Sequence, residues 1–220
     1  MYTLPLVAPE GLSANGSTGA STRTAERALD LLRQLPPTFT YTQARQAGLS
    51  HRGLYGLRGA GIVEPLGRGL YRRVDAVLTD PTLTEVAVRA PLATLCLTSA
   101  LVEHDLSDAI PTAPHLALPR GSRFPSTTGP VTWHAFAAET FELGRIRRRV
   151  DSQLQLGLYN AERTIVDTFR LRHLTGSDEA YEALRRWLSR RGSQPSTLLT
   201  MAGHFPRTLP SIRHALEVLL

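Results

Sequence analysis

The chain has 220 residues, of which 42% are hydrophobic, so its length suits one large or two small domains with packed cores. All 25 basic residues are Arg, which excludes enzyme classes that depend on lysine, such as Walker-type NTPases, Schiff-base enzymes and nucleases with a catalytic lysine. Positive charge is concentrated between residues 21 and 75, where nine Arg oppose four acidic residues, a net of +5 out of a total of +6.

The first twenty residues are rich in Gly, Ser, Thr and Pro without periodicity, and we expect a disordered tail there. A first helix follows, with Thr22 or Thr24 as its N-cap, and Pro36-Pro37 ends it. Its apolar positions lie on one face and are Ala28, Leu31, Leu32 and Leu35.

Residues 42–61 have the pattern of a helix-turn-helix. Ala44 is small enough to let a second helix cross closely, and Gly48 can adopt the left-handed conformation that ends the first helix. Ser50 is placed to cap the second helix, and Leu54 and Leu57 give that helix an apolar stripe. Such a unit chiefly places a helix in a DNA groove.

The face of the second helix opposite Leu54 and Leu57 carries groups suited to DNA. Arg can pair bidentately with guanine or bind phosphate, and Tyr and His can donate to phosphate oxygens. We therefore expect Arg52, Tyr55 and Arg58 to face the major groove, with Ser50 and His51 near phosphate.

After Gly61 the pattern becomes extended and predicts a β-hairpin, or wing, from Ile62 to Arg73 with Gly67-Arg68-Gly69 at its tip. Pro65 indicates that its first strand lies at a sheet edge. We expect Arg68, Arg72 and Arg73 to contact the DNA backbone or minor groove from this wing.

Three glycines, Gly53, Gly56 and Gly59, weaken the second helix as a reader of bases, since each costs roughly 0.5–1 kcal/mol of helix stability relative to Ala. They favour an alternative, a protein-interaction module whose winged domain no longer reads DNA. A helical subdomain capped by a hairpin without a nucleic-acid role is the remaining structural interpretation.

We assign residues 21–75 to this DNA-binding domain and residues 76–220 to a second, larger α+β domain. Asp80-Pro81 opens a helix that ends before Pro91, and Ser99 is a candidate cap for the next. Strands before helices argue against a doubly wound sheet. Strands are expected at 115–119, 131–136, 145–153 and 154–159, and helices at 161–174, 178–191, from 195 and at 210–220.

Arginines of the second domain form two candidate contact surfaces. A strand would place Arg145, Arg147 and Arg149 on one side, ready to meet DNA, tRNA or an acidic protein face, while a solvated strand face is the alternative. The helix 178–191 presents Arg185 and Arg186, either as an ordinary solvated surface or as a contact with nucleic acid or a partner.

Other polar groups have structural explanations. Arg163 and Asp167 are four residues apart, the spacing of an ion pair on one helix face. His104, Asp105, Asp108, His115 and His134 match no metal-ligand or triad spacing, so we expect neither enzyme activity, nor a cofactor, nor a metal. Cys96 lies in an apolar run and is expected to be a buried, inert thiol. Without a membrane-length apolar run or signal peptide, a cytoplasmic protein is expected.

Several segments, in order, resemble the AbiEi-type antitoxins of abortive-infection toxin–antitoxin systems, from about Thr24 to Leu220. Similar proteins have a wing like Gly67–Tyr71, and a helix that starts like Ser99-Ala100-Leu101 within Thr98–Leu106. They also have a strand running into Pro-Arg-Gly, here Leu116–Gly121, and a helix start like Glu162–Asp167.

The resemblance implies a winged helix-turn-helix followed by an α+β domain, and two activities in phage defence. One is autorepression of transcription by binding inverted repeats in operator DNA, which requires two protomers or self-association on DNA. The other is neutralisation of a nucleotidyltransferase-like toxin, chiefly through the C-terminal domain. Many relatives carry Arg or Lys where Gly53, Gly56 and Gly59 stand here.

Overall fold

The structure is a computed structural model that describes residues 17–76, 80–151 and 153–220. The described residues divide by their contacts into two compact units. One extends to Pro65 and includes Gly69–Ala76, and the other comprises Leu66–Arg68 and the residues from Asp80 onward.

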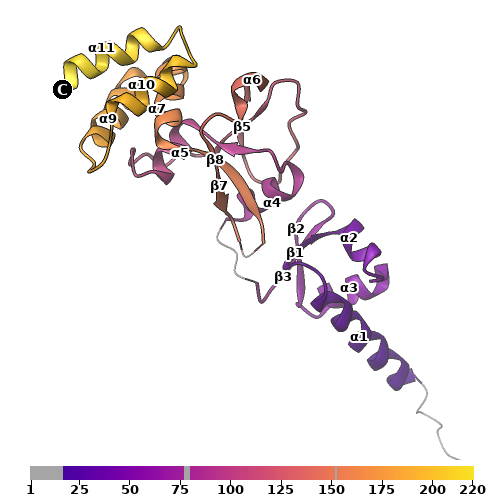
Figure 1. Ribbon diagram of the computed structural model, residues 1–220. Coiled ribbons are helices and arrows are strands. Elements are labelled where there is room, and N and C mark those ends of the chain that lie inside the picture. Colours follow the sequence, from indigo (N-terminus) through magenta and orange to yellow (C-terminus); the bar gives the residue numbers. More distant parts are fainter. Residues whose placement is uncertain (1–16, 77–79, 152) are drawn as a thin grey trace, which may run out of the picture. The chain divides into compact units, whose positions relative to one another are not determined.

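The first unit contains three helices and a three-stranded sheet (Figure 1). The strands pair in the order β1-β3-β2, with β1 antiparallel to β3 and Phe39 opposite Tyr71. In chain order the elements are α1 (Ser17–Arg33), β1 (Thr38–Thr40), α2 (Tyr41–Gln46), α3 (His51–Gly59), β2 (Val63–Gly67) and β3 (Leu70–Arg73).

The turn between α2 and α3 forms for the reasons that the sequence indicates. Gly48 has a φ of +87°, the left-handed region, and Ser50 caps α3 by accepting from the Gly53 N–H at 3.0 Å. Arg45 adds a bond from Nη1 to the Leu49 carbonyl at 3.2 Å. Leu54 and Leu57 are buried, as predicted.

Two expectations for this unit were wrong. Helix α1 begins at Ser17, so Thr22 and Thr24 lie inside it rather than capping it, and residues 17–20 are helical rather than a tail. Residues 1–16 of the expected tail lie outside the described residues. Strand β1 was not predicted, because three residues are too few to show a period.

The second unit is built on a five-stranded sheet with the order β6-β5-β4-β8-β7. Strand β4 is parallel to β8 and β5 to β6, while β4–β5 and β7–β8 are antiparallel. The sheet is therefore mixed rather than doubly wound, and the unit is α+β. The strands are β4 (Thr94–Leu95), β5 (His115–Pro119), β6 (Thr132–Phe136), β7 (Arg145–Arg149) and β8 (Gln155–Tyr159).

Helices cover this sheet and extend beyond it. Asp80 caps α4 with Pro81 in the first turn, as predicted, and α4 packs with Leu116 and Leu118 of β5 in one buried cluster. A second cluster joins α5, α7, α9, α10 and α11 around residues such as Trp187 (Figure 1). The helices are α4 (Pro81–Arg89), α5 (Leu97–Glu103), α6 (Ala138–Phe141), α7 (Ala161–Arg170), α8 (Arg172–Thr175), α9 (Ser177–Leu188), α10 (Pro195–Gly203) and α11 (Leu209–Leu219).

Ser99 is not the cap of α5. The helix begins at Leu97, and the Ser99 hydroxyl accepts instead from the His115 N–H at 2.9 Å. The predicted helix 161–174 is interrupted at Leu171 and gives α7 and α8. No helix in the described part of the chain is both long enough and apolar enough to cross a bilayer.

Candidate nucleic-acid interface

Helix α3 presents an aromatic and basic surface on the side away from its buried leucines. The rings of His51 and Tyr55 lie 4.3 Å apart, and the Arg58 guanidinium lies 5.0 Å from the Tyr55 ring centre. Tyr55 is 49% exposed, and His51 and Arg52 are exposed as well. Four of the five side chains expected to meet DNA from this helix therefore share one accessible face.

Tyr41, which the sequence reasoning missed, joins this surface from the start of α2. Its ring meets the His51 ring edge-on at 6.3 Å, and 36% of the residue is exposed. The signal was a large aromatic residue directly after the Thr40 cap, at a position outside the apolar stripe of α2. The two helices thus contribute side chains to one continuous face.

Ser50, the fifth of these residues, has a structural role. Its hydroxyl oxygen accepts the Gly53 N–H, so a phosphate contact is restricted to donation of the hydroxyl proton. The cap fixes the start of α3 and with it the direction of the neighbouring His51 and Arg52.

Of the three wing arginines, only Arg68 has an exposed side chain. Arg72 is 14% exposed, and it bonds Glu64 at 2.6 Å and the Ala76 carbonyl at 2.9 Å, so its expected DNA contact is corrected to a structural role. Arg73 holds Asp75 through two bonds of 3.0 and 2.9 Å, and this pairing lowers the pKa of the Asp75 carboxyl. Arg73 is thus already neutralised by a neighbouring carboxylate.

Arg145 is also corrected. Its side chain, 16% exposed, crosses Gly157 of β8 and donates from Nε to Thr94 Oγ1 of β4 at 2.8 Å. Arg147 and Arg149 of the same strand are exposed, and Arg148 is paired with Glu103 through two bonds. The expected three-arginine surface is reduced to two.

The arginines of α9 are tied to carboxylates. Arg185 bonds Glu182 at 2.6 Å, while Arg186 bonds both Glu182 at 3.0 Å and Asp108 at 2.6 Å. These pairs lower the pKa values of Glu182 and Asp108 and raise that of Arg186. Arg185 and Arg186 therefore present much less free positive charge than their sequence suggests.

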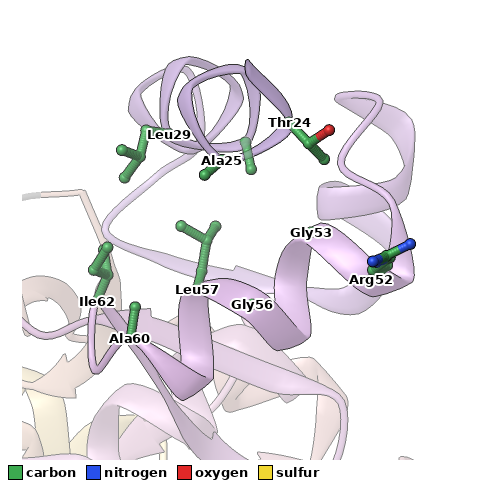
Figure 2. A pocket seen from close by; sticks show the side chains of 10 residues that line it. Thr24, Ala25, Leu29, Arg52, Gly53, Gly56, Leu57, Ala60 and Ile62 are labelled. Carbon is green, nitrogen blue, oxygen red and sulfur yellow. The ribbon is translucent and has the colours of Figure 1, made fainter. Parts of the chain in front are cut away.

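An open groove of about 550 Å³ runs between α1 and α3 (Figure 2). Its walls are mostly small or apolar, with Leu29 on one side and Leu57 and Ile62 on the other. Added Cβ atoms at Gly56 and Gly59 would meet no other heavy atom within 4 Å, whereas one at Gly53 would press on Leu49 and Ser50. Packing within the described chain therefore accounts for Gly53 but not for Gly56 or Gly59.

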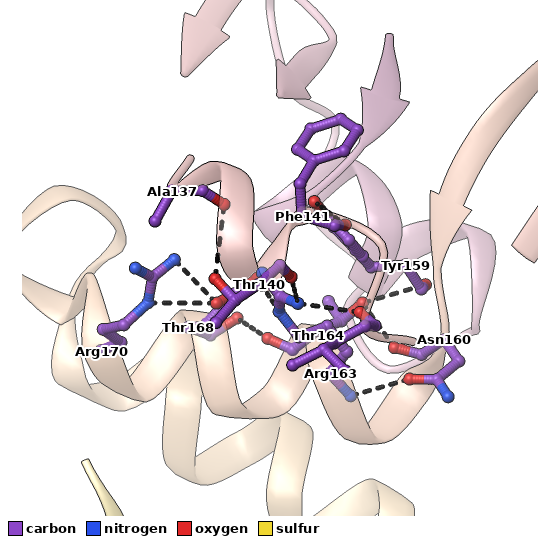
Figure 3. Close-up of polar contacts among 11 residues, drawn as sticks. Ala137, Thr140, Phe141, Tyr159, Asn160, Arg163, Thr164, Thr168 and Arg170 are labelled. Atoms are coloured by element: carbon purple, nitrogen blue, oxygen red, sulfur yellow. Dashed lines mark hydrogen bonds and ion pairs between the residues drawn. The ribbon is translucent and has the colours of Figure 1, made fainter. Parts of the chain in front are cut away.

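The pair predicted at Arg163 and Asp167 forms the centre of a buried polar network (Figure 3). Both side chains are fully buried, with Arg163 Nε 2.8 Å from Asp167 Oδ2. Arg163 Nη1 donates to the Thr140 and Leu143 carbonyls at 2.6 and 2.8 Å, and its guanidinium lies 4.3 Å from the Tyr159 ring centre. This network connects α7 to α6 and β8.

The remaining titratable groups do not form a reactive constellation. Cys96 is buried, and burial raises the pKa of its thiol well above the ordinary value. His134 Nε2 lies 3.1 Å from His115 Nδ1, and burial together with His115 lowers the pKa of His134 to about 4. No group of three or more His, Cys, Asp or Glu side chains that could hold a metal ion occurs within residues 17–76, 80–151 and 153–220.

Comparison with known proteins identifies the first unit. Residues 26–74 match the model of a family described as a transcriptional regulator, AbiEi antitoxin. The match confirms the resemblance drawn from the sequence, and it covers the segment that contains α2, α3 and the β2–β3 hairpin. A search of curated proteins gave no significant match.

Proposed function

We propose that this chain, whose residues 26–74 belong to the AbiEi antitoxin regulators, binds operator DNA through that segment as a winged helix-turn-helix. The observation that carries the proposal is the exposed face of α3, where His51, Tyr55 and Arg58 lie in contact beside Arg52. In this arrangement α3 enters the major groove, and Arg68 contacts the phosphate backbone from the tip of the hairpin.

Each side chain has a distinct expected role. Arg52 is the candidate for bidentate base reading, because it is exposed near the N-terminal end of α3, where recognition helices contact bases. Tyr55 and His51 are candidate phosphate donors, and the contact with Tyr55 restricts the motion of the Arg58 guanidinium. Arg72 and Arg73 support the hairpin instead.

A titration with labelled DNA tests this. Duplexes are the region upstream of the chain's own gene and a scrambled sequence, each at several salt concentrations. We expect Arg68→Ala to weaken binding to both and to reduce the salt slope by about one unit. Arg52→Ala should lose roughly 1–3 kcal/mol on the native sequence and less on the scrambled one. Arg33→Ala, which removes an exposed charge from the far end of α1, is the matched control. Native-sequence binding that ignores Arg52, Arg68 and salt contradicts the proposal.

The family description supports an antitoxin role, with a nucleotidyltransferase-like toxin neutralised by the second unit. Arg147 and Arg149, exposed side by side on one face of β7, are the candidate contact for an acidic face of that toxin. Co-expression with the product of the adjacent gene tests this: the chain should restore growth, and Arg147→Glu with Arg149→Glu should abolish the rescue while leaving operator binding intact.

The groove between α1 and α3 favours a second candidate, a protein-interaction module. Gly56 and Gly59 weaken α3 without relieving any clash within the described chain, so their value would lie in close approach by another protein. In that case a chain without operator affinity would still bind a partner, and Gly56→Leu would abolish that binding.

A further inference from the structure

The second unit contains an open pocket of about 810 Å³ that the functions proposed above do not use. It lies between the end of α7, α8 and the segment that joins α10 to α11. Its volume falls within the range of about 300–1,000 Å³ that is usual for small-molecule sites. The question is which ligand chemistry its walls suit.

The walls are strongly basic. Arg170, Arg172 and Arg207 line the pocket together with His173 and His204, and no Asp or Glu is among its described lining residues. Arg172 and Arg207 form no ion pair with any carboxylate in the described part of the chain. The arginines of α9 and β7, by contrast, are largely paired with carboxylates.

The charge beneath the pocket is not balanced either. Asp167 is shared between two cations, Arg163 at 2.8 Å and Arg170 at 2.8 Å, which leaves this buried group with a net charge of +1. Phe136 and Phe205 hold the Arg170 guanidinium, whose centre lies 4.9 and 5.3 Å from the ring centres. The Arg170 side chain is 28% exposed, so part of this fixed positive charge is open to solvent.

Hydroxyl and apolar groups complete the lining. Ser211 accepts a long bond from Arg172 Nη1 at 3.3 Å, and Thr208 adds a second hydroxyl. Phe169, Phe205 and Pro206 form an apolar wall. Guanidinium groups match phosphate oxygens bidentately, and an apolar wall beside them suits a flat organic group.

We propose that this pocket binds a phosphate-bearing ligand of nucleotide size. Its phosphates contact Arg170, Arg172 and Arg207, and its organic part lies against Phe205 and Pro206. The proposal does not depend on operator recognition, because every residue involved belongs to the second unit.

Calorimetry on the full chain tests this with ATP, GTP and pyrophosphate as phosphate probes, adenosine as an uncharged probe and citrate as a carboxylate probe. A short scrambled DNA duplex distinguishes a polynucleotide from a free ligand as the source of the phosphate. We expect saturable binding of ATP or GTP with a Kd below roughly 1 mM, weaker binding of pyrophosphate, and none of adenosine or citrate.

The variant Arg172→Ala with Arg207→Ala should weaken the binding at least about tenfold, since it removes two charge-assisted contacts from solvent-accessible positions. Arg213→Ala, an exposed arginine of α11 that does not line the pocket, is the matched control and should bind as the wild type does. Circular dichroism confirms that the variants are folded. If the duplex alone binds and the double variant weakens it, the phosphate belongs to nucleic acid. Absence of binding by every phosphate probe, equal binding of citrate, or indifference to the double variant would overturn the proposal.

Discussion

Replacing Arg163 by Met removes a buried cation while keeping a long apolar side chain. The change leaves the Asp167 carboxylate with Arg170 as its one remaining ion-pair partner, and it leaves the Thr140 and Leu143 carbonyls without the donor that serves both. Removing one partner of a buried ion pair costs about 3–5 kcal/mol, and an unpaired buried acceptor adds about 1–3 kcal/mol. Because Arg170 still offsets part of the charge, we expect a total loss of about 3–5 kcal/mol.

Urea unfolding followed by the fluorescence of Trp187 measures this loss, because Trp187 is buried in the same helical cluster as α7. Arg185→Met is the control: its pair with Glu182 is solvent-exposed, so the loss should be at most about 0.5 kcal/mol. A loss below about 1 kcal/mol for Arg163→Met would refute the conclusion that this network holds α7 in place.

The double variant Arg163→Met with Asp167→Met separates charge from packing. If the uncompensated carboxylate dominates the cost, the double variant is more stable than the sum of the two single effects predicts, by roughly 1–3 kcal/mol. Strict additivity would mean that the carbonyl bonds and the ring contacts, rather than the ion pair, carry the energy.

Three further changes test other parts of the structure. The lowered pKa values of His134 and His115 mean that the unfolded chain binds protons that the folded chain refuses, so stability should fall as the pH drops from about 6.5 to about 4, by about 1–2 kcal/mol after allowance for solvent screening; thermal unfolding measures this, and His134→Gln should flatten the slope. Gly157→Ala places a methyl group against Thr94 Oγ1 and 2.6 Å from Arg145 Nε, so urea unfolding should show a loss of about 1–3 kcal/mol. Gly56→Ala meets open space in a helix and should raise thermal stability by about 0.5–1 kcal/mol; a decrease would mean that the groove is occupied within the chain.

The sequence was sufficient where the controlling interactions are local. Helix α3 could be predicted because its cap, Ser50, lies next to it, and because Leu54 and Leu57 have a helical spacing. The glycine turn at Gly48 is local for the same reason. The short strand β1 could not be predicted, since its stability comes from pairing with β3, whose residues lie more than thirty positions later in the chain.

The candidate site was predicted less completely, because a charged residue is identified by type but its partner is not. Arg72 and Arg145 have the same side chain as Arg68, yet Glu64 holds the first and Thr94 the second. The distance in sequence between Arg145 and Thr94 is 51 residues, so no local pattern could have shown that bond.

The same reasoning explains why the pocket of the second unit escaped notice. Arg170 and Arg172 follow one helix, Arg207 follows another, and neither segment has a charge run as dense as Arg145–Arg149. The dense run is largely committed to internal bonds, whereas Arg172 and Arg207 contribute uncompensated charge to one cavity. Positive charge available to a ligand therefore depends on which carboxylates the fold brings near each arginine, and in this chain the most conspicuous cluster in sequence is a poor guide to it.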